Sequence, residues 1–147
     1  MKLNLKVVMI TAALAATVAY AEGTRTDPNA IARAQTMGAI GGGMKVLGGM
    51  AKGEVAYDAA AAQAAKDAII AAAATIPANF MTQGAEDPAS EAKPDIWANW
   101  DDFVVKATAL SVAATALDVS SMETIGAGLG AVGGACKACH TANRMSK

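Results

Sequence analysis

Residues with apolar side chains recur at spacings of three and four along four stretches of the chain, which is the period of an amphipathic helix. The first stretch begins at Asp27-Pro28, where a capping side chain precedes a proline at the first helical position, and it ends near Gly53. Its inward stripe is Arg33, Met37, Ile40, Met44, Leu47 and Ala51. The second stretch covers residues 58–76 and is rich in alanine, and we expect it to end at Pro77, which lacks the backbone N–H of a helix interior.

The second half of the chain predicts two more helices after a long connection over residues 77–93. Pro94 begins the third helix, whose stripe is Ile96, Trp100, Phe103, Ala107, Leu110, Ala114 and Leu117. Ser120 and Glu123 form a capping box that begins the fourth helix. The stripe of this helix is Met122, Ile125, Leu129, Val132, Cys136 and Cys139. No alternating run predicts a strand, so we expect an all-α fold, an antiparallel four-helix bundle.

Composition narrows the function classes and raises a question about glycine. With 147 residues and a formal net charge of −1, the chain is one small domain without the basic patch that nucleic-acid binding requires. Glycines cluster at residues 41–43, 48–49 and 126–134, and each costs roughly 1 kcal/mol relative to alanine inside a helix. Small residues let a neighbouring helix or a flat ligand approach the backbone. The other reading is a membrane interface, which Lys45 and Lys52 disfavour, so no membrane span is expected in the mature chain.

The first residues have the pattern of an export signal. Lys2 and Lys6 precede an uncharged apolar stretch at residues 7–18, and Ala19-Tyr20-Ala21 has the small-x-small pattern of a cleavage site. A membrane anchor is the alternative, but the apolar stretch is shorter than the ~20 residues that a span needs. We therefore expect a cleaved signal peptide at residues 1–21, a mature domain at residues 22–147, and a periplasmic location.

The chemistry is predicted at Cys136-Lys137-Ala138-Cys139-His140. On a helix the two thiols are one turn apart and the imidazole is on the same face. Two thiols can add to the two vinyl groups at one edge of a porphyrin while the imidazole reaches the iron, and this spacing is the haem c attachment motif. Because both cysteines continue the apolar stripe, the sequence predicts one covalent haem c inside the bundle, on its C-terminal helix.

Three other readings of these residues remain. A thioredoxin-like redox pair needs a βαβ context, which the sequence lacks. A structural zinc site needs a fourth ligand, and the chain contains no further Cys or His. A short disulfide explains the two cysteines but not the adjacent His140. Because no acid–base pair or nucleophile accompanies the motif, we expect no enzyme activity.

Three segments of the mature chain carry a family resemblance. They are the motif of residues 136–140 followed by Arg144, the segment 47–60, and the segment 92–97 that opens the third helix. With these segments the chain resembles the class II cytochromes c, the cytochrome c′ family, which are four-helix bundles. The resemblance implies that Cys136 and Cys139 carry the thioether bonds and that His140 is the proximal iron ligand.

The same resemblance implies roles for residues outside the motif. It implies that Arg33 and Arg144 lie near the haem propionates or the proximal face, and that Glu91 and Trp97 lie in the segment that flanks the haem. The alternatives are a solvated Arg33, a helix C-terminal cation for Arg144, and simple packing or surface positions for Glu91 and Trp97. The chain departs from the family at Ala34 and Asn143, where a polar residue and an aromatic residue are common.

The resemblance places Met37 over the distal face of the iron. A thioether ligand there gives a low-spin centre suited to one-electron transfer, which is the expected function; Met44, two turns further on, is the weaker candidate. If Met37 only covers the iron, the alternative is a high-spin cytochrome c′ that binds NO or CO for scavenging or sensing. Family members are often homodimers through their first two helices, whereas the sequence does not indicate which proteins are the redox partners.

Overall fold

The first long helix begins where the sequence predicts it. The computed structural model describes residues 24–146, so the signal peptide predicted at residues 1–21 lies outside the described residues. Helix α1 spans Pro28–Ala51, and the Asp27 carboxylate accepts a hydrogen bond from the Ala30 N–H at 2.9 Å. The predicted stripe is confirmed, because Arg33, Ile40 and Leu47 are buried and the members between them are half-buried.

Helix α2 runs past the proline at which the sequence predicted its end. It spans Ala59–Phe80, is capped by the Asp58 carboxylate, and contains Pro77 in its interior. The prediction was wrong because tertiary contacts hold the last turn although proline removes one backbone hydrogen bond. Phe80 is buried with its ring centroid 5.0 Å from that of Phe103, and its carbonyl accepts a hydrogen bond from the Trp97 indole N–H.

The predicted third helix is divided into two. Helix α3 spans Asp95–Ala98 and α4 spans Trp100–Ala116, with a break at Asn99, whose φ of −126° and ψ of 49° are not helical. The backbone N–H and the side-chain amide of Asn99 both donate to the Asp95 carbonyl, at 2.9 and 3.2 Å. The side-chain bond stabilises Asn99 in its non-helical conformation, so the predicted single helix was wrong.

Helix α5 spans Met122–Asn143, and its capping box lies one residue later than predicted. Ser121 accepts from the Thr124 N–H at 3.2 Å, and the Thr124 hydroxyl accepts from the Ser121 N–H at 3.1 Å. The Ser120 N–H instead donates to Asp118. The predicted box of Ser120 and Glu123 was therefore wrong, because the threonine hydroxyl performs the role assigned to the glutamate.

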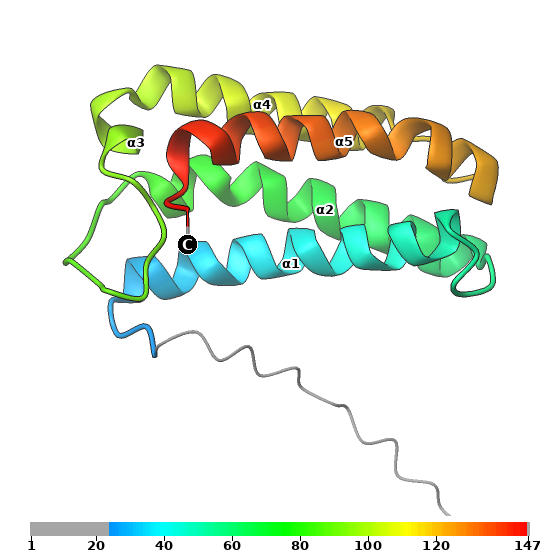
Figure 1. Ribbon diagram of the computed structural model, residues 1–147, viewed down its shortest axis with the longest axis horizontal. Helices are drawn as coiled ribbons and strands as arrows, with labels where there is room; N and C mark the ends of the chain where they lie inside the picture. The colour runs from blue at the N-terminus through cyan, green and yellow to red at the C-terminus, as the bar shows by residue number, and fades with distance from the viewer. Residues whose placement is uncertain (1–23, 147) are drawn as a thin grey trace, which may run out of the picture.

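The four long helices lie side by side as a bundle (Figure 1). Helix α1 packs on α2 and α5, and α4 packs on α2 and α5. The largest fully buried side chains are Leu47, Ile69, Ile96, Ile125 and Val132. Over residues 24–146, the only β pairing is an isolated bridge between Ala92 and Arg144. By length and composition alone α2 could cross a membrane, but here it packs on α1 and α4 as a bundle helix.

The connection between α2 and α3 is tied to the beginning of α1 by two buried carboxylates. Asp87 accepts from the N–H groups of Thr26 and Asp27, at 2.8 and 3.0 Å, and Asp27 accepts from the Ala85 N–H. Backbone N–H donors lower the pKa of both aspartates, chiefly Ala30 for Asp27 and Asp27 for Asp87. Gly84 has a φ of 75°, and a Cβ there would lie 2.6 Å from an Asp27 carboxylate oxygen, so this turn requires glycine.

Candidate functional site

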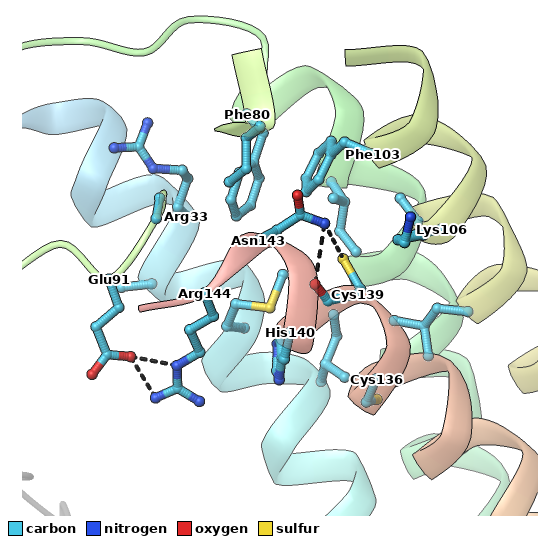
Figure 2. Close-up of a pocket in the computed structure, with 18 of the residues that line it drawn as sticks. Arg33, Phe80, Glu91, Phe103, Lys106, Cys136, Cys139, His140, Asn143 and Arg144 are labelled. Atoms are coloured by element: carbon cyan, nitrogen blue, oxygen red, sulfur yellow. Dashed lines mark hydrogen bonds and ion pairs between the residues drawn. The ribbon is translucent and has the colours of Figure 1, made fainter. Parts of the chain in front are cut away.

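A cavity of about 430 Å³ lies near the end of the bundle where α1 begins and α5 finishes (Figure 2). Every helix contributes to its wall, together with the segment 90–92. Most of the wall is apolar, and its charged and larger polar side chains are Arg25, Arg33, Glu91, Lys106, His140, Asn143 and Arg144. The cavity therefore suits a large, mainly apolar group that also carries charge.

The predicted attachment motif lies in this wall, on the last turns of α5. Cys136 and Cys139 are free thiols, both half-buried, and burial raises the pKa of each. His140 follows on the same helix, where burial is the main cause that lowers its pKa; Arg144 lowers it further and Glu91 opposes them. Among residues 24–146 the structure has no cluster of three or more Cys, His, Asp or Glu side chains that could hold a metal ion.

Helix α1 forms the wall that faces α5. Met37 and Met44, both half-buried, line the cavity, and Gly38 and Gly41 line it between them. A Cβ added at either glycine would meet no atom within 4 Å. These two glycines therefore leave open space beside the methionine side chains.

Arg33 lies at the cavity wall but is buried, with 5% of its surface exposed. One guanidinium nitrogen donates to the carbonyls of Thr82 and Gln83, at 3.2 and 3.1 Å. The guanidinium also packs over the rings of Phe80 and Trp97, with its central carbon 5.7 and 5.4 Å from their centroids. The Nε atom is buried and meets no acceptor among the described residues.

Arg144 and Glu91 join the end of α5 to the connection before α3. The two side chains form an ion pair, drawn in Figure 2, in which both Nε and a terminal nitrogen of the arginine contact one carboxylate oxygen. Backbone bonds run beside the pair: Lys93 N–H donates to the Asn143 carbonyl at 3.0 Å, and Met145 N–H donates to the Glu91 carbonyl at 2.8 Å. The ion pair and these two backbone bonds hold the turn of α5 that carries His140 against the connection before α3.

Trp97 is the predicted site residue that does not line the cavity. Its indole N–H donates to the Phe80 carbonyl at 2.7 Å, and its ring packs against Arg33. Trp97 therefore lies behind the wall, where it supports Arg33 and the end of α2. The structure thus brings Cys136, Cys139, His140, Arg33, Met37, Arg144 and Glu91 to one cavity and leaves Trp97 outside it.

Three charged or larger polar residues of the wall were missed as site residues, namely Arg25, Lys106 and Asn143. Asn143 is buried and donates to the Cys139 carbonyl at 3.1 Å and to the Cys139 sulfur at 3.6 Å. Its place four residues after Cys139 is a signal in the sequence, since that spacing puts both on one helix face. Lys106 enters the wall from α4, and its separation from the motif along the chain left no such signal.

A four-helix bundle whose Cys-x-x-Cys-His motif opens into an apolar cavity is the arrangement of a c-type haem protein. The family model described as Cytochrome C′ matches residues 29–144. Cytochrome c-556 of Agrobacterium tumefaciens is 41% identical over 119 residues, which cover 79% of this chain and 94% of the relative. The structure of a cytochrome c′ from Rhodobacter spheriodes superposes with a TM-score of 0.73 at 30% identity, over 81% of this chain and 96% of that one.

A further similar structure is the nitric oxide complex of a mutant of cytochrome c prime from Alcaligenes xylosoxidans. It superposes with a TM-score of 0.71 at 28% identity and covers 81% of this chain and 94% of that one. The chain belongs to the cytochrome c′ family. Family membership implies a covalent haem c, for which Cys136 and Cys139 are the attachment residues, and it makes the protein a haem electron carrier.

The residues present fit such a group. The two thiols and the imidazole are the required donors. The buried Nε of Arg33, which has no acceptor in the described part of the chain, is suited to a carboxylate such as a haem propionate. The open wall over Gly38 and Gly41 leaves room for a flat group.

Proposed function

We propose that this cytochrome is an exported one-electron carrier and not an enzyme, with His140 as the proximal ligand of its haem iron and Met37 as the distal ligand. When bound, the haem supplies the one-electron couple of its iron. The position of Met37 carries this proposal, because its side chain lines the cavity from α1 while His140 lines it from α5. A thioether and an imidazole from facing helices suit electron transfer, since little must rearrange when the charge changes.

The other side chains of the wall have supporting roles in this proposal. Cys136 and Cys139 hold the group at one edge, and the Nε of Arg33 binds a propionate. Trp97 keeps Arg33 in place by packing on its guanidinium. Arg144, paired with Glu91, holds the last turn of α5 so that the His140 ring keeps its direction.

The absorption spectrum of the reduced protein tests the proposed ligands. We expect sharp, split visible bands from the wild-type protein and a broad high-spin band from Met37→Ala. Met44→Ala is the matched control, since Met44 lines the same wall two turns away; it should keep the sharp bands. A Met37→Ala spectrum identical to that of the wild type would exclude Met37 as the ligand.

A second function, binding of NO or CO at a hindered site, is supported by the open space beside Met37 at Gly38 and Gly41. The similar structure from Alcaligenes xylosoxidans is a nitric oxide complex. In this alternative Met37 covers the site and moves aside for the gas. Titration of the reduced wild-type protein with NO distinguishes the two functions: a broad initial spectrum that changes at low NO concentration supports gas binding, and sharp bands that resist NO support electron transfer.

Export and a periplasmic location rest on the sequence of residues 1–21 and on the family. We propose cleavage after Ala21, which leaves one domain at residues 22–147. The mass of the protein purified from a periplasmic extract tests both points. A mature chain that begins at Glu22 and carries one haem is the expected result, and a full-length chain confined to membranes would contradict it.

A homodimer through α1 and α2 is a further part of the proposal. The outer faces of these helices are rich in small side chains and include the partly exposed Ile31 and Val46. Close approach of a second copy would cover them. Sedimentation equilibrium of the haem-loaded protein should give twice the chain mass, whereas a monomer at high concentration would contradict the dimer.

A further inference from the structure

Lys106 is the only lysine in the cavity wall among residues 24–146. It stands on α4, and Figure 2 shows it above Cys139, away from the Arg33 and Glu91 side of the cavity. Its side chain is 24% exposed and forms an ion pair with Asp102, one helical turn earlier. The Asp102 side chain is 58% exposed and does not line the cavity, so the positive member of the pair is the one on the cavity side.

The two charged groups contact each other, but only the lysine side chain lines the cavity, so they cancel only in part there. Water screens an exposed charge strongly, whereas a half-buried charge acts through a medium of lower dielectric constant. The cavity therefore experiences a net positive potential from this pair.

We propose that Lys106 sets the midpoint potential of this cytochrome by stabilising its reduced state, and that Asp102 limits the size of this effect. Reduction lowers the charge of the haem centre by one unit. A nearby cation repels the oxidised centre more than the reduced one and so favours the reduced form. The inference rests on the proposed one-electron function and on attachment at Cys139. It assigns Lys106 a tuning role through space, not a ligand role.

Redox titration of the haem-loaded protein, followed by absorbance, tests the inference. Lys106→Gln should lower the midpoint potential, and Asp102→Asn should raise it. The double variant should return close to the wild-type value, and Lys106→Arg, which keeps the charge, should stay near it. Lys137→Gln is the matched control, because this lysine lies between the two cysteines but is exposed; its shift should be smaller than that of Lys106→Gln.

Shifts of the midpoint potential in opposite directions for the two single variants distinguish electrostatic tuning from a purely structural role. Both single variants break the same ion pair, so a role in folding alone would move the potential in the same direction or not at all. Unchanged band positions in the reduced spectra show that the iron ligands are retained. If Lys106→Gln does not fold, the upward shift of Asp102→Asn, at an exposed position, still decides the question.

The redox titration distinguishes failure of the tuning role alone from failure of the proposed function. A wild-type protein with a normal one-electron wave, in which Lys106→Gln shifts the potential no more than Lys137→Gln, overturns the tuning role and leaves the proposed function intact. The same holds if both members of the pair shift the potential in one direction. A wild-type protein with no reversible one-electron wave overturns the proposed function and the tuning role together.

Discussion

The bundle has a closed half and a half that contains the cavity, and two glycines of α1 have opposite surroundings in them. In the closed half, around Leu47, Ile69 and Ile125, a Cβ added at Gly43 would lie 2.6 Å from an Ile69 carbon and 2.8 Å from the Ala65 carbonyl oxygen. In the cavity half, a Cβ at Gly41 would meet no atom within 4 Å. Gly43 thus permits close helix contact in the closed half, and Gly41 leaves open space in the wall of the cavity half.

The halves also differ in polarity. Among the described residues, the buried polar and charged side chains all belong to the cavity half: Asp27, Arg33, Thr36, Asp87 and Asn143. The closed half is stabilised by apolar burial, while the cavity half combines a bound cofactor with hydrogen bonds to carboxylates and carbonyls. Perturbing each half should therefore affect stability in a different way.

The largest expected effect on stability comes from Leu47→Ala. Leu47 is fully buried in the closed half, so the free energy of unfolding should fall by about 2–5 kcal/mol, through lost burial and a residual cavity. Met44→Ala, at a half-buried position in the cavity wall, should cost less. Urea unfolding of the haem-loaded proteins, followed by circular dichroism, measures both; equal losses would remove the distinction between the halves.

A smaller effect is expected at Gly43. Gly43→Ala should lower the free energy of unfolding by about 1–3 kcal/mol, because the new methyl group overlaps Ile69 and the Ala65 backbone. Its neighbour Gly42 is the control, since a Cβ there meets nothing within 4 Å. Gly42→Ala should stabilise α1 by up to roughly 1 kcal/mol through helix propensity. Thermal unfolding of both variants checks the signs, and stabilisation by Gly43→Ala would contradict the close contact.

The smallest effect is a change of pH dependence in the cavity half. Backbone N–H groups, first that of Asp27, lower the pKa of Asp87 in the folded state. Its contribution to stability is therefore complete above the unfolded value of about 4 and is lost as the pH falls through the lower folded value. Asp87→Asn should flatten this acid limb in urea unfolding measured between neutral and acidic pH. An acid limb as steep as that of the wild type would show that Asp87 does not cause it.

The sequence predicted the stripes and the attachment motif more reliably than the ends of the helices. The stripe through Arg33, Ile40 and Leu47 is confirmed, because a spacing of three and four along one helix is a local property. Pro77 was a wrong helix end, since the contacts of Phe80 with α4 and Trp97 outweigh the missing hydrogen bond. The Asn99 break is accompanied by a local bond from its side-chain amide to the Asp95 carbonyl, and the apolar pattern contains no signal for that bond.

The sequence by itself determined the all-α bundle, the covalent haem c and its place on the last helix. The bundle follows from the apolar spacing within each of four stretches, and the haem follows from a motif within one helix. Only the tertiary structure decided that Lys106 lines the cavity, that Trp97 lies behind the cavity wall, and that Glu91 forms an ion pair with Arg144. These relations link elements far apart in the chain. They depend on how the helices pack and on where the connection between α2 and α3 lies. The spacing of residues within one helix contains no information about either.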